Sequence, residues 1–132
     1  MNRIKQREQA FVLLFQSQFK SNDDDDESLA LYNENVEQIG DYAIELFKGV
    51  KDNTEEIDEI ISQYIQGWKI GRISKVNLSI LRIAVFEMKY IDSVPDSVAI
   101  NEAVELCKKY SGKEDSSFIN GVLGSYSRSG CR

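Results

Sequence analysis

The sequence has no histidine, and this absence removes the commonest general base near neutral pH and the commonest imidazole ligand of metals. Its two cysteines, Cys107 and Cys131, form neither a CxxC pair nor a secreted disulfide framework, which favours a reducing cytoplasm. No apolar run approaches the roughly 20 residues that span a bilayer, so we expect no membrane segment. These absences argue against triads, zinc sites and anchors, and they predict a cytoplasmic, non-enzymatic protein without a cofactor.

Two short motifs resemble ligand-binding loops but fail on residue type. In the string SGKED, Cys107 stands where a P-loop needs its first glycine, and Glu114 stands where Ser or Thr would hold magnesium. In the acidic run 23–27, Ser28 occupies the position at which a calcium loop needs glycine. We therefore interpret the acidic run as a solvated connector between helices.

Charge is segregated along the chain, whose net charge is -6. Residues 1–20 carry +3 and residues 66–90 carry +4, whereas residues 21–65 contain fourteen acids against Lys48 and Lys51. Phosphate binding depends on local positive charge rather than on the total. The distribution predicts a polarised molecule in which RNA contact is confined to one side.

Apolar residues recur at helical spacing, and no segment alternates long enough for a strand, so the predicted fold class is all-α. The helix after Ser74 is apolar nearly all round, which predicts a central, buried position. A capping-box pattern at Asn53 and Glu56 predicts another helix start, and Gly112 predicts a helix end. The predicted helices cover 3–20, two segments around 32–50 divided at Gly40 and Asp41, 53–68, 74–91, 95–110 with Pro95 in the first turn, and a short one from Ser117.

Arg82 lies in this apolar helix, where an arginine must reach solvent or pair with a carboxylate. We favour pairing, and the candidate partners are Glu87, Glu102 and Glu105. Cys107 falls on an apolar helical stripe, which favours a small packed hydrophobe over a nucleophile.

Asn101 and Glu102 in the string VAINEAVEL, and Asn120 and Gly121 in FINGVL, are compatible with function or with architecture. We favour architecture, because glycine permits close helix approach and buried amides often bridge loops.

Three strings in the C-terminal half, LRIAVFE, AINEAVELCKKY and FINGVL, follow one another in a family-specific order. With Arg7, Ala10, Leu14, Phe15, Trp68 and Arg72, they make the whole chain resemble the NusB family of bacterial transcription antitermination factors. The resemblance implies a single domain over residues 1–132, with a NusB-like fold of seven helices in two packed helical subdomains.

The resemblance also implies binding of a short single-stranded RNA element called boxA. In this numbering the implied RNA-binding residues are Arg3, Lys5, Arg7, Lys113, Glu114, Ser117 and Phe118. Cations would follow the phosphates and Phe118 would stack on an unpaired base, although packing of Phe118 against Val122 is equally supported. So few cations predict weak RNA binding by the chain alone.

The implied protein partner is the ribosomal protein NusE, with RNA delivered to the RNA polymerase elongation complex in support of ribosomal RNA transcription. The implied partner-binding residues are Phe15, Arg72, Asn77 and Leu78. The family commonly has tyrosine in place of Phe15 and an acidic residue in place of Asn77. A homodimer through the same face is left open.

Two alternatives remain at this point. The first is a helical protein-interaction module with little RNA binding of its own, which the acidic total charge favours. The second is a module linked to a ribosomal RNA cytosine methyltransferase, in which a related helical domain precedes the catalytic one. No cofactor-binding Rossmann segment follows in this sequence, so we favour it less.

Overall fold

Seven α-helices and two short 3-10 turns make up the regular structure of residues 2–19 and 24–130, the part of the chain that the computed structural model describes. No strand occurs within these ranges, and the predicted all-α fold class is confirmed. The elements in chain order are α1 (Arg3–Ser17), α2 (Asp25–Asn35), α3 (Asp41–Asp52), α4 (Thr54–Tyr64), η1 (Ile70–Arg72), α5 (Lys75–Tyr90), α6 (Asp96–Tyr110), η2 (Lys113–Asp115) and α7 (Ser116–Ser129).

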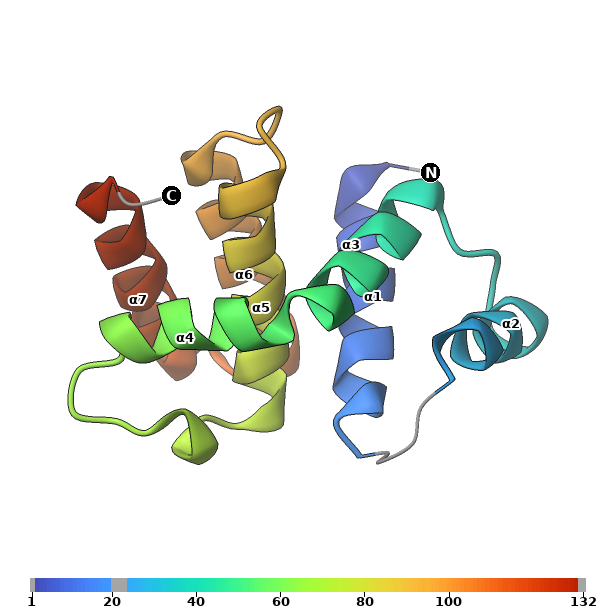
Figure 1. Cartoon of the computed structure of the whole chain (residues 1–132), viewed down its shortest axis with the longest axis horizontal. Coiled ribbons are helices and arrows are strands. Elements are labelled where there is room, and N and C mark those ends of the chain that lie inside the picture. The colour runs from blue at the N-terminus through green and yellow to red at the C-terminus, as the bar shows by residue number, and fades with distance from the viewer. Residues whose placement is uncertain (1, 20–23, 131–132) are drawn as a thin grey trace.

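The helices form two packed groups, as predicted (Figure 1). One group holds α1, α2 and α3, and the other holds α4 to α7, with α3 leading almost directly into α4. The central helix α5 packs against α1, α3, α4, α6 and α7, so it belongs to the core of both groups.

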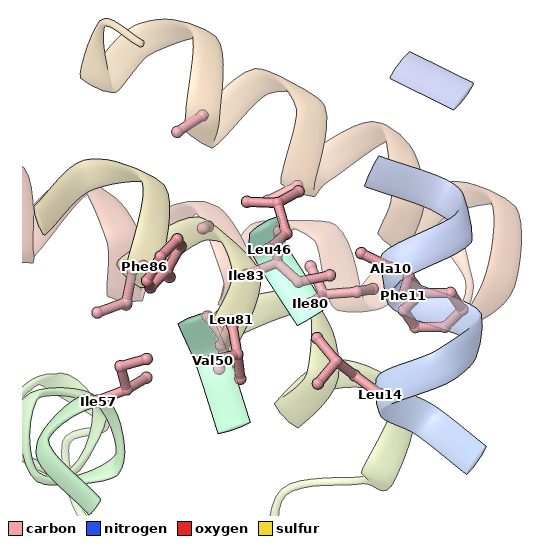
Figure 2. Close-up of a cluster of buried hydrophobic side chains, with 14 of the residues drawn as sticks. Ala10, Phe11, Leu14, Leu46, Val50, Ile57, Ile80, Leu81, Ile83 and Phe86 are labelled. Carbon is pink, nitrogen blue, oxygen red and sulfur yellow. The ribbon is translucent and has the colours of Figure 1, made fainter. Parts of the chain in front are cut away.

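The apolar character of α5 explains this central position. Eleven of its sixteen residues are buried. Ser74 is the predicted N-cap, and its hydroxyl accepts a hydrogen bond from the backbone amide of Asn77 (3.1 Å). Figure 2 shows side chains from α1, α3, α4 and α5 meeting in one cluster, with Leu46 and Ile80 among the fully buried ones. Burial on several faces excludes water from the helix that joins the two groups.

The acidic run 23–27 differs from the predicted connector, because α2 begins inside it. The side chain of Asp24 accepts a hydrogen bond from the backbone amide of Glu27. Acidic side chains in the first turn of a helix are also stabilised by the unpaired backbone amides at its N-terminus. Lys48 and Lys51 of α3 also pair with acids of that turn. The part of the run before Asp24 lies outside the described residues.

Three helices end earlier than predicted. α2 ends at Asn35, although the first of the two segments divided at Gly40 and Asp41 was predicted to continue to that division. α1 ends at Ser17, whereas the prediction continued to Lys20, which lies outside the described residues. α4 ends at Tyr64, so Trp68 follows the helix instead of belonging to it. The expected capping box also does not form, because the amide group of Asn53 donates to the carbonyl of Gly49 (2.8 Å) and no side-chain cap is made.

Arg82 is paired, as predicted, but with a different acid. Its Nε and Nη2 donate to the two oxygens of Asp58 on α4, each at 2.8 Å. The candidate partners on α5 and α6 were therefore wrong, because α4 packs across α5 at this level.

The architectural interpretation of the two Asn-containing strings was wrong. Asn101 and Asn120 are exposed and line a polar groove between α6 and α7. A Cβ added to Gly121 would meet no atom within 4 Å, so no close helix approach requires this glycine. In the described ranges, no helix combines the length and apolarity that crossing a membrane demands.

Candidate nucleic-acid and protein interface

Arg7 lies in the interior rather than on a surface. Its Nε is 3.0 Å and 2.9 Å from the two oxygens of Glu87 on α5, and the two side chains are 5% and 1% exposed. The hydroxyl of Tyr42 donates to the same carboxylate, and this contact together with burial raises the pKa of Tyr42. The predicted RNA contact of Arg7 does not fit this geometry, because a buried ion pair occupies its guanidinium.

Arg3 and Lys5, by contrast, are exposed at the start of α1. The guanidinium of Arg3 lies 4.1 Å from the centre of the Tyr42 ring, a cation–π contact that orients it. Lys5 lies within ion-pair distance of Glu8 (3.5 Å) and Glu37 (3.3 Å). Of these two predicted RNA contacts, Lys5 is therefore partly neutralised by acids of its own chain.

Glu8 connects the start of the chain to the end of α6. Its carboxylate accepts hydrogen bonds from Lys109 (2.5 Å) and from the hydroxyl of Tyr110 (2.7 Å). The Lys109 contact is the main cause that lowers the pKa of Glu8. The ring of Phe11 lies 4.7 Å from that of Tyr110, which packs α1 against this end of α6. The first helix thus contacts the end of α6, directly before the connector to α7, and we call this junction the α1–α6 edge.

This edge carries both signs of charge. A hollow of about 270 Å³ beside α1 is lined by Lys5 and Lys109 and also by Glu8, Glu102 and Glu105. The N-terminal segment is basic in sequence, but the fold adds acids from α6. The predicted separation of charge is therefore incomplete at this point.

The connector between α6 and α7 holds the remaining predicted RNA-binding residues. The amides of Ser111 and Gly112 donate to the carbonyl of Cys107, and Gly112 takes φ +140, so the predicted helix stop is observed. Lys113, Glu114 and Ser117 are exposed, and Phe118 is half-buried at the start of α7. These four residues belong to one continuous segment, 113–118.

A buried polar network fixes this connector to α5. The side-chain amide of Asn77 donates a hydrogen bond to Oδ2 of Asp115 (3.1 Å), and the hydroxyl of Ser111 donates to the same oxygen. These two hydrogen bonds hold the pKa of Asp115 below its usual value, and the bond from Ser111 has the larger effect. Burial raises the pKa of the Cys107 thiol, whose Sγ is 3.8 Å from Oδ1 of Asn77, so Cys107 is a packed side chain as predicted.

Of the four predicted partner-binding residues, Phe15 lies near the end of α1 and Leu78 in the first turn of α5, whereas Arg72 and Asn77 line a hollow beside Phe118. The side chain of Gln18 donates to the carbonyl of Lys75 (2.8 Å) and to Ser79 (2.6 Å), which joins these helix ends. Arg72 is exposed and Phe15 is half-buried, whereas Asn77 and Leu78 are 6% and 9% exposed.

Three surface residues near these sets were not predicted as site residues: Trp68, Lys109 and Tyr110. Trp68 is 55% exposed, and its ring centre lies 6.4 Å from that of Phe118. In sequence Trp68 follows Tyr64 at helical spacing, and this spacing predicted a helical position rather than an exposed one. The adjacent Gly67 is a signal for a helix end and could have indicated the exposure. The string KKY at the end of α6 gave no signal that Glu8 would accept hydrogen bonds from Lys109 and Tyr110.

The sequence matches the NusB family over residues 4–128. The transcription antitermination protein NusB of Acetivibrio thermocellus is 46% identical over 127 residues, covering 94% of this chain and 87% of that protein. The protein of the same name from Clostridium botulinum (strain Kyoto) is 42% identical over 144 residues, covering 94% of this chain and 98% of that protein.

Solved structures agree with these relatives. NusB of T. maritima matches with a TM-score of 0.85 at 30% identity, covering 97% of this chain and 92% of that chain. A chain from the crystal structure of antitermination factors NusB and NusE in complex with dsRNA matches with a TM-score of 0.82 at 26% identity, covering 98% and 99%. The fold and these relatives together define a helical factor of the transcription antitermination class. The chain belongs to the NusB family, which confirms the resemblance seen in its sequence.

Proposed function

We propose that this antitermination factor pairs with the ribosomal protein NusE, binds single-stranded boxA RNA and supports ribosomal RNA transcription by RNA polymerase in the cytoplasm. The observation that carries the proposal is the contact of α1 with the end of α6, where Glu8 accepts hydrogen bonds from Lys109 and Tyr110 directly before the α6–α7 connector. A related NusB has been crystallised with NusE and dsRNA, which supports both classes of partner.

The proposed RNA-binding residues are exposed or half-buried at the start of α1 and in the segment that follows α6: Arg3, Lys5, Lys113, Glu114, Ser117 and Phe118. Arg7 is left out because of its buried pair with Glu87. Cations would follow the phosphates, and the half-buried ring of Phe118 favours an unpaired base over a closed duplex. Three phosphate contacts on a single strand correspond to a log–log salt slope of only about -2, so the partner must add affinity.

The proposed NusE contacts are Phe15 and Arg72, with Asn77 and Leu78 shaping that face from beneath. The ring of Phe15 packs against Phe11 on one side and Phe19 on the other, so an aromatic surface continues along α1. The same face is the candidate contact of a homodimer, which size-exclusion chromatography with light scattering would detect.

A second candidate, an interaction module with little RNA binding, is favoured by the ion pairs that occupy Lys5 and Lys109. A gel-shift titration separates the two, using boxA and scrambled RNA with and without NusE at two salt concentrations. We expect NusE to increase the preference for boxA, and alanine at Arg3, Lys5 and Lys113 to weaken it, while Lys48→Ala on the acidic side serves as control. Equal retention of both RNAs under every condition would exclude boxA recognition.

A further inference from the structure

The only tryptophan of the chain projects from a turn beside the proposed RNA-binding residues. The amide of Trp68 donates to the carbonyl of Ile65 (3.0 Å), and Gly67 takes φ +74, which ends α4 and redirects the backbone. Trp68 remains 55% exposed. A tryptophan ring exposed to this extent offers a large apolar face on which a ligand ring can stack.

Trp68 and Phe118 form a splayed aromatic pair. Their ring centres are 6.4 Å apart and the ring planes are tilted by 56°, so the rings touch without stacking face to face. A hollow of about 290 Å³ adjoins the pair, and both rings line it together with Arg72, Asn77 and Asp115. The hollow therefore has aromatic walls and a polar floor.

The polar floor is held in a fixed orientation. Asn77 and Ser111 both donate to Oδ2 of Asp115, so these two bonds leave Oδ1 as a further acceptor of the same carboxylate. An exocyclic amino group donates to such an oxygen, and adenine, cytosine and guanine carry one, whereas uracil does not. Arg72, which is proposed above as a NusE contact, also lines the hollow, so the hollow adjoins the NusE face.

We propose that Trp68 and Phe118 are the walls of a pocket for one unpaired RNA base, and that Asp115 selects a base bearing an exocyclic amino group. This inference rests on the proposed function, since it extends the RNA contact of Phe118. It makes Trp68 a base-binding residue and Asp115 a specificity-determining one.

The sole tryptophan provides a direct probe. The full chain is titrated with hexamers of A, C or U, following Trp68 emission and, in parallel, the anisotropy of labelled RNA. We expect the A and C hexamers to quench emission and to bind more tightly than the U hexamer. Trp68→Ala is expected to lower affinity for the A hexamer about 10-fold through lost stacking, while Trp68→Phe retains most of it. Tyr90→Ala, which truncates an exposed aromatic outside both proposed binding surfaces, is the matched control and is expected to bind unchanged.

Asp115→Asn tests the selection of the base without changing side-chain size. The amide oxygen must take the position of Oδ2 to accept from Asn77 and Ser111, which places its NH₂ where Oδ1 was. A donor at that place favours the carbonyl of uracil, so the preference for A and C over U is expected to reverse. Circular dichroism confirms that each variant folds.

The outcomes separate this inference from the proposed function. RNA binding with unchanged Trp68 emission, or full affinity in Trp68→Ala, would overturn the pocket and leave the proposed function standing. A Trp68→Ala variant that loses NusE binding but keeps RNA binding would assign the pocket to the protein partner and also overturn it. Absence of binding to the hexamers and to boxA, even with NusE, would remove both proposals.

Discussion

Arg7 and Glu87 form a buried ion pair that joins the first helix to the central one, with Nε 3.0 Å and 2.9 Å from the two carboxylate oxygens. The hydroxyl of Tyr42 donates to the same carboxylate, so one acidic group of α5 holds both α1 and α3. One turn earlier, Arg3 lies on the outer face of the same tyrosine ring. The first helix therefore has one arginine for the core and another for the surface.

Removing Arg7 is expected to destabilise the fold strongly. Arg7→Ala leaves Glu87 charged and buried without its partner, which costs about 3 to 5 kcal/mol. Urea denaturation measures the change in the free energy of unfolding, and Arg3→Ala is the surface control, expected to change it by less than about 1 kcal/mol. A loss below about 1 kcal/mol in Arg7→Ala would contradict the structural role of this pair.

Two glycine-to-alanine changes are expected to shift stability in opposite directions. A Cβ at Gly49 would lie 2.2 Å from Cζ of the buried Phe86, so Gly49→Ala overpacks the contact of α3 with α5 and costs about 1 to 3 kcal/mol. A Cβ at Gly121 meets open space within α7, so Gly121→Ala gains about 0.5 to 1 kcal/mol from helix propensity. Urea midpoints that move the same way would argue against this packing.

Glu8→Gln is expected to strengthen RNA binding. The neutral side chain no longer pairs with Lys5 and Lys109, and each cation that then contacts a phosphate steepens the log–log salt slope by about 0.7. Fluorescence anisotropy at several salt concentrations gives the slope. Glu59→Gln, on the exposed side of α4, changes the net charge equally and is the control. Equal gains in both variants would show that only total charge matters.

Stability is expected to be insensitive to pH from about pH 5 to 8, because the sequence lacks histidine. Below that range, Glu8 contributes, since Lys109 holds its pKa under the ordinary 4.5. A carboxyl with a lowered folded-state pKa stabilises the fold above its unfolded pKa, and that stabilisation is lost as pH falls through the folded value. Thermal melts should therefore show a smaller acid loss in Glu8→Gln than in the parent chain. An identical loss in both would contradict the Glu8–Lys109 pairing.

Local pattern was enough to predict an all-helical chain and the start of α5, because apolar spacing, Ser74 and Gly112 each act through neighbours in sequence, but it did not predict the bounds of α1, α2 and α4. Contacts between distant segments were not predictable in this way. The pairing of Arg82 was expected from its apolar helix, but Asp58 lies 24 residues upstream and only the crossing of α4 brings it close.

The candidate site was predicted less well for the same reason. Judged from its neighbours in sequence, Arg7 resembles a surface cation. Its burial depends on Glu87, which lies 80 residues away. Trp68 continues the helical spacing of α4, but the helix ends one turn earlier, at Tyr64. The exposure of Trp68 therefore depends on where α4 ends. Lys109 is one of two adjacent lysines, and only the fold places it against Glu8.

The most direct test of the proposed RNA-binding residues is NMR mapping of amide chemical shifts as boxA RNA is added to the protein bound to NusE. We expect shifts at the start of α1, at Lys109 and across 113–118, with the acidic helix α2 and the last turns of α3 unaffected. Shifts concentrated on α2 and α3, with none in the α6–α7 connector, would contradict it.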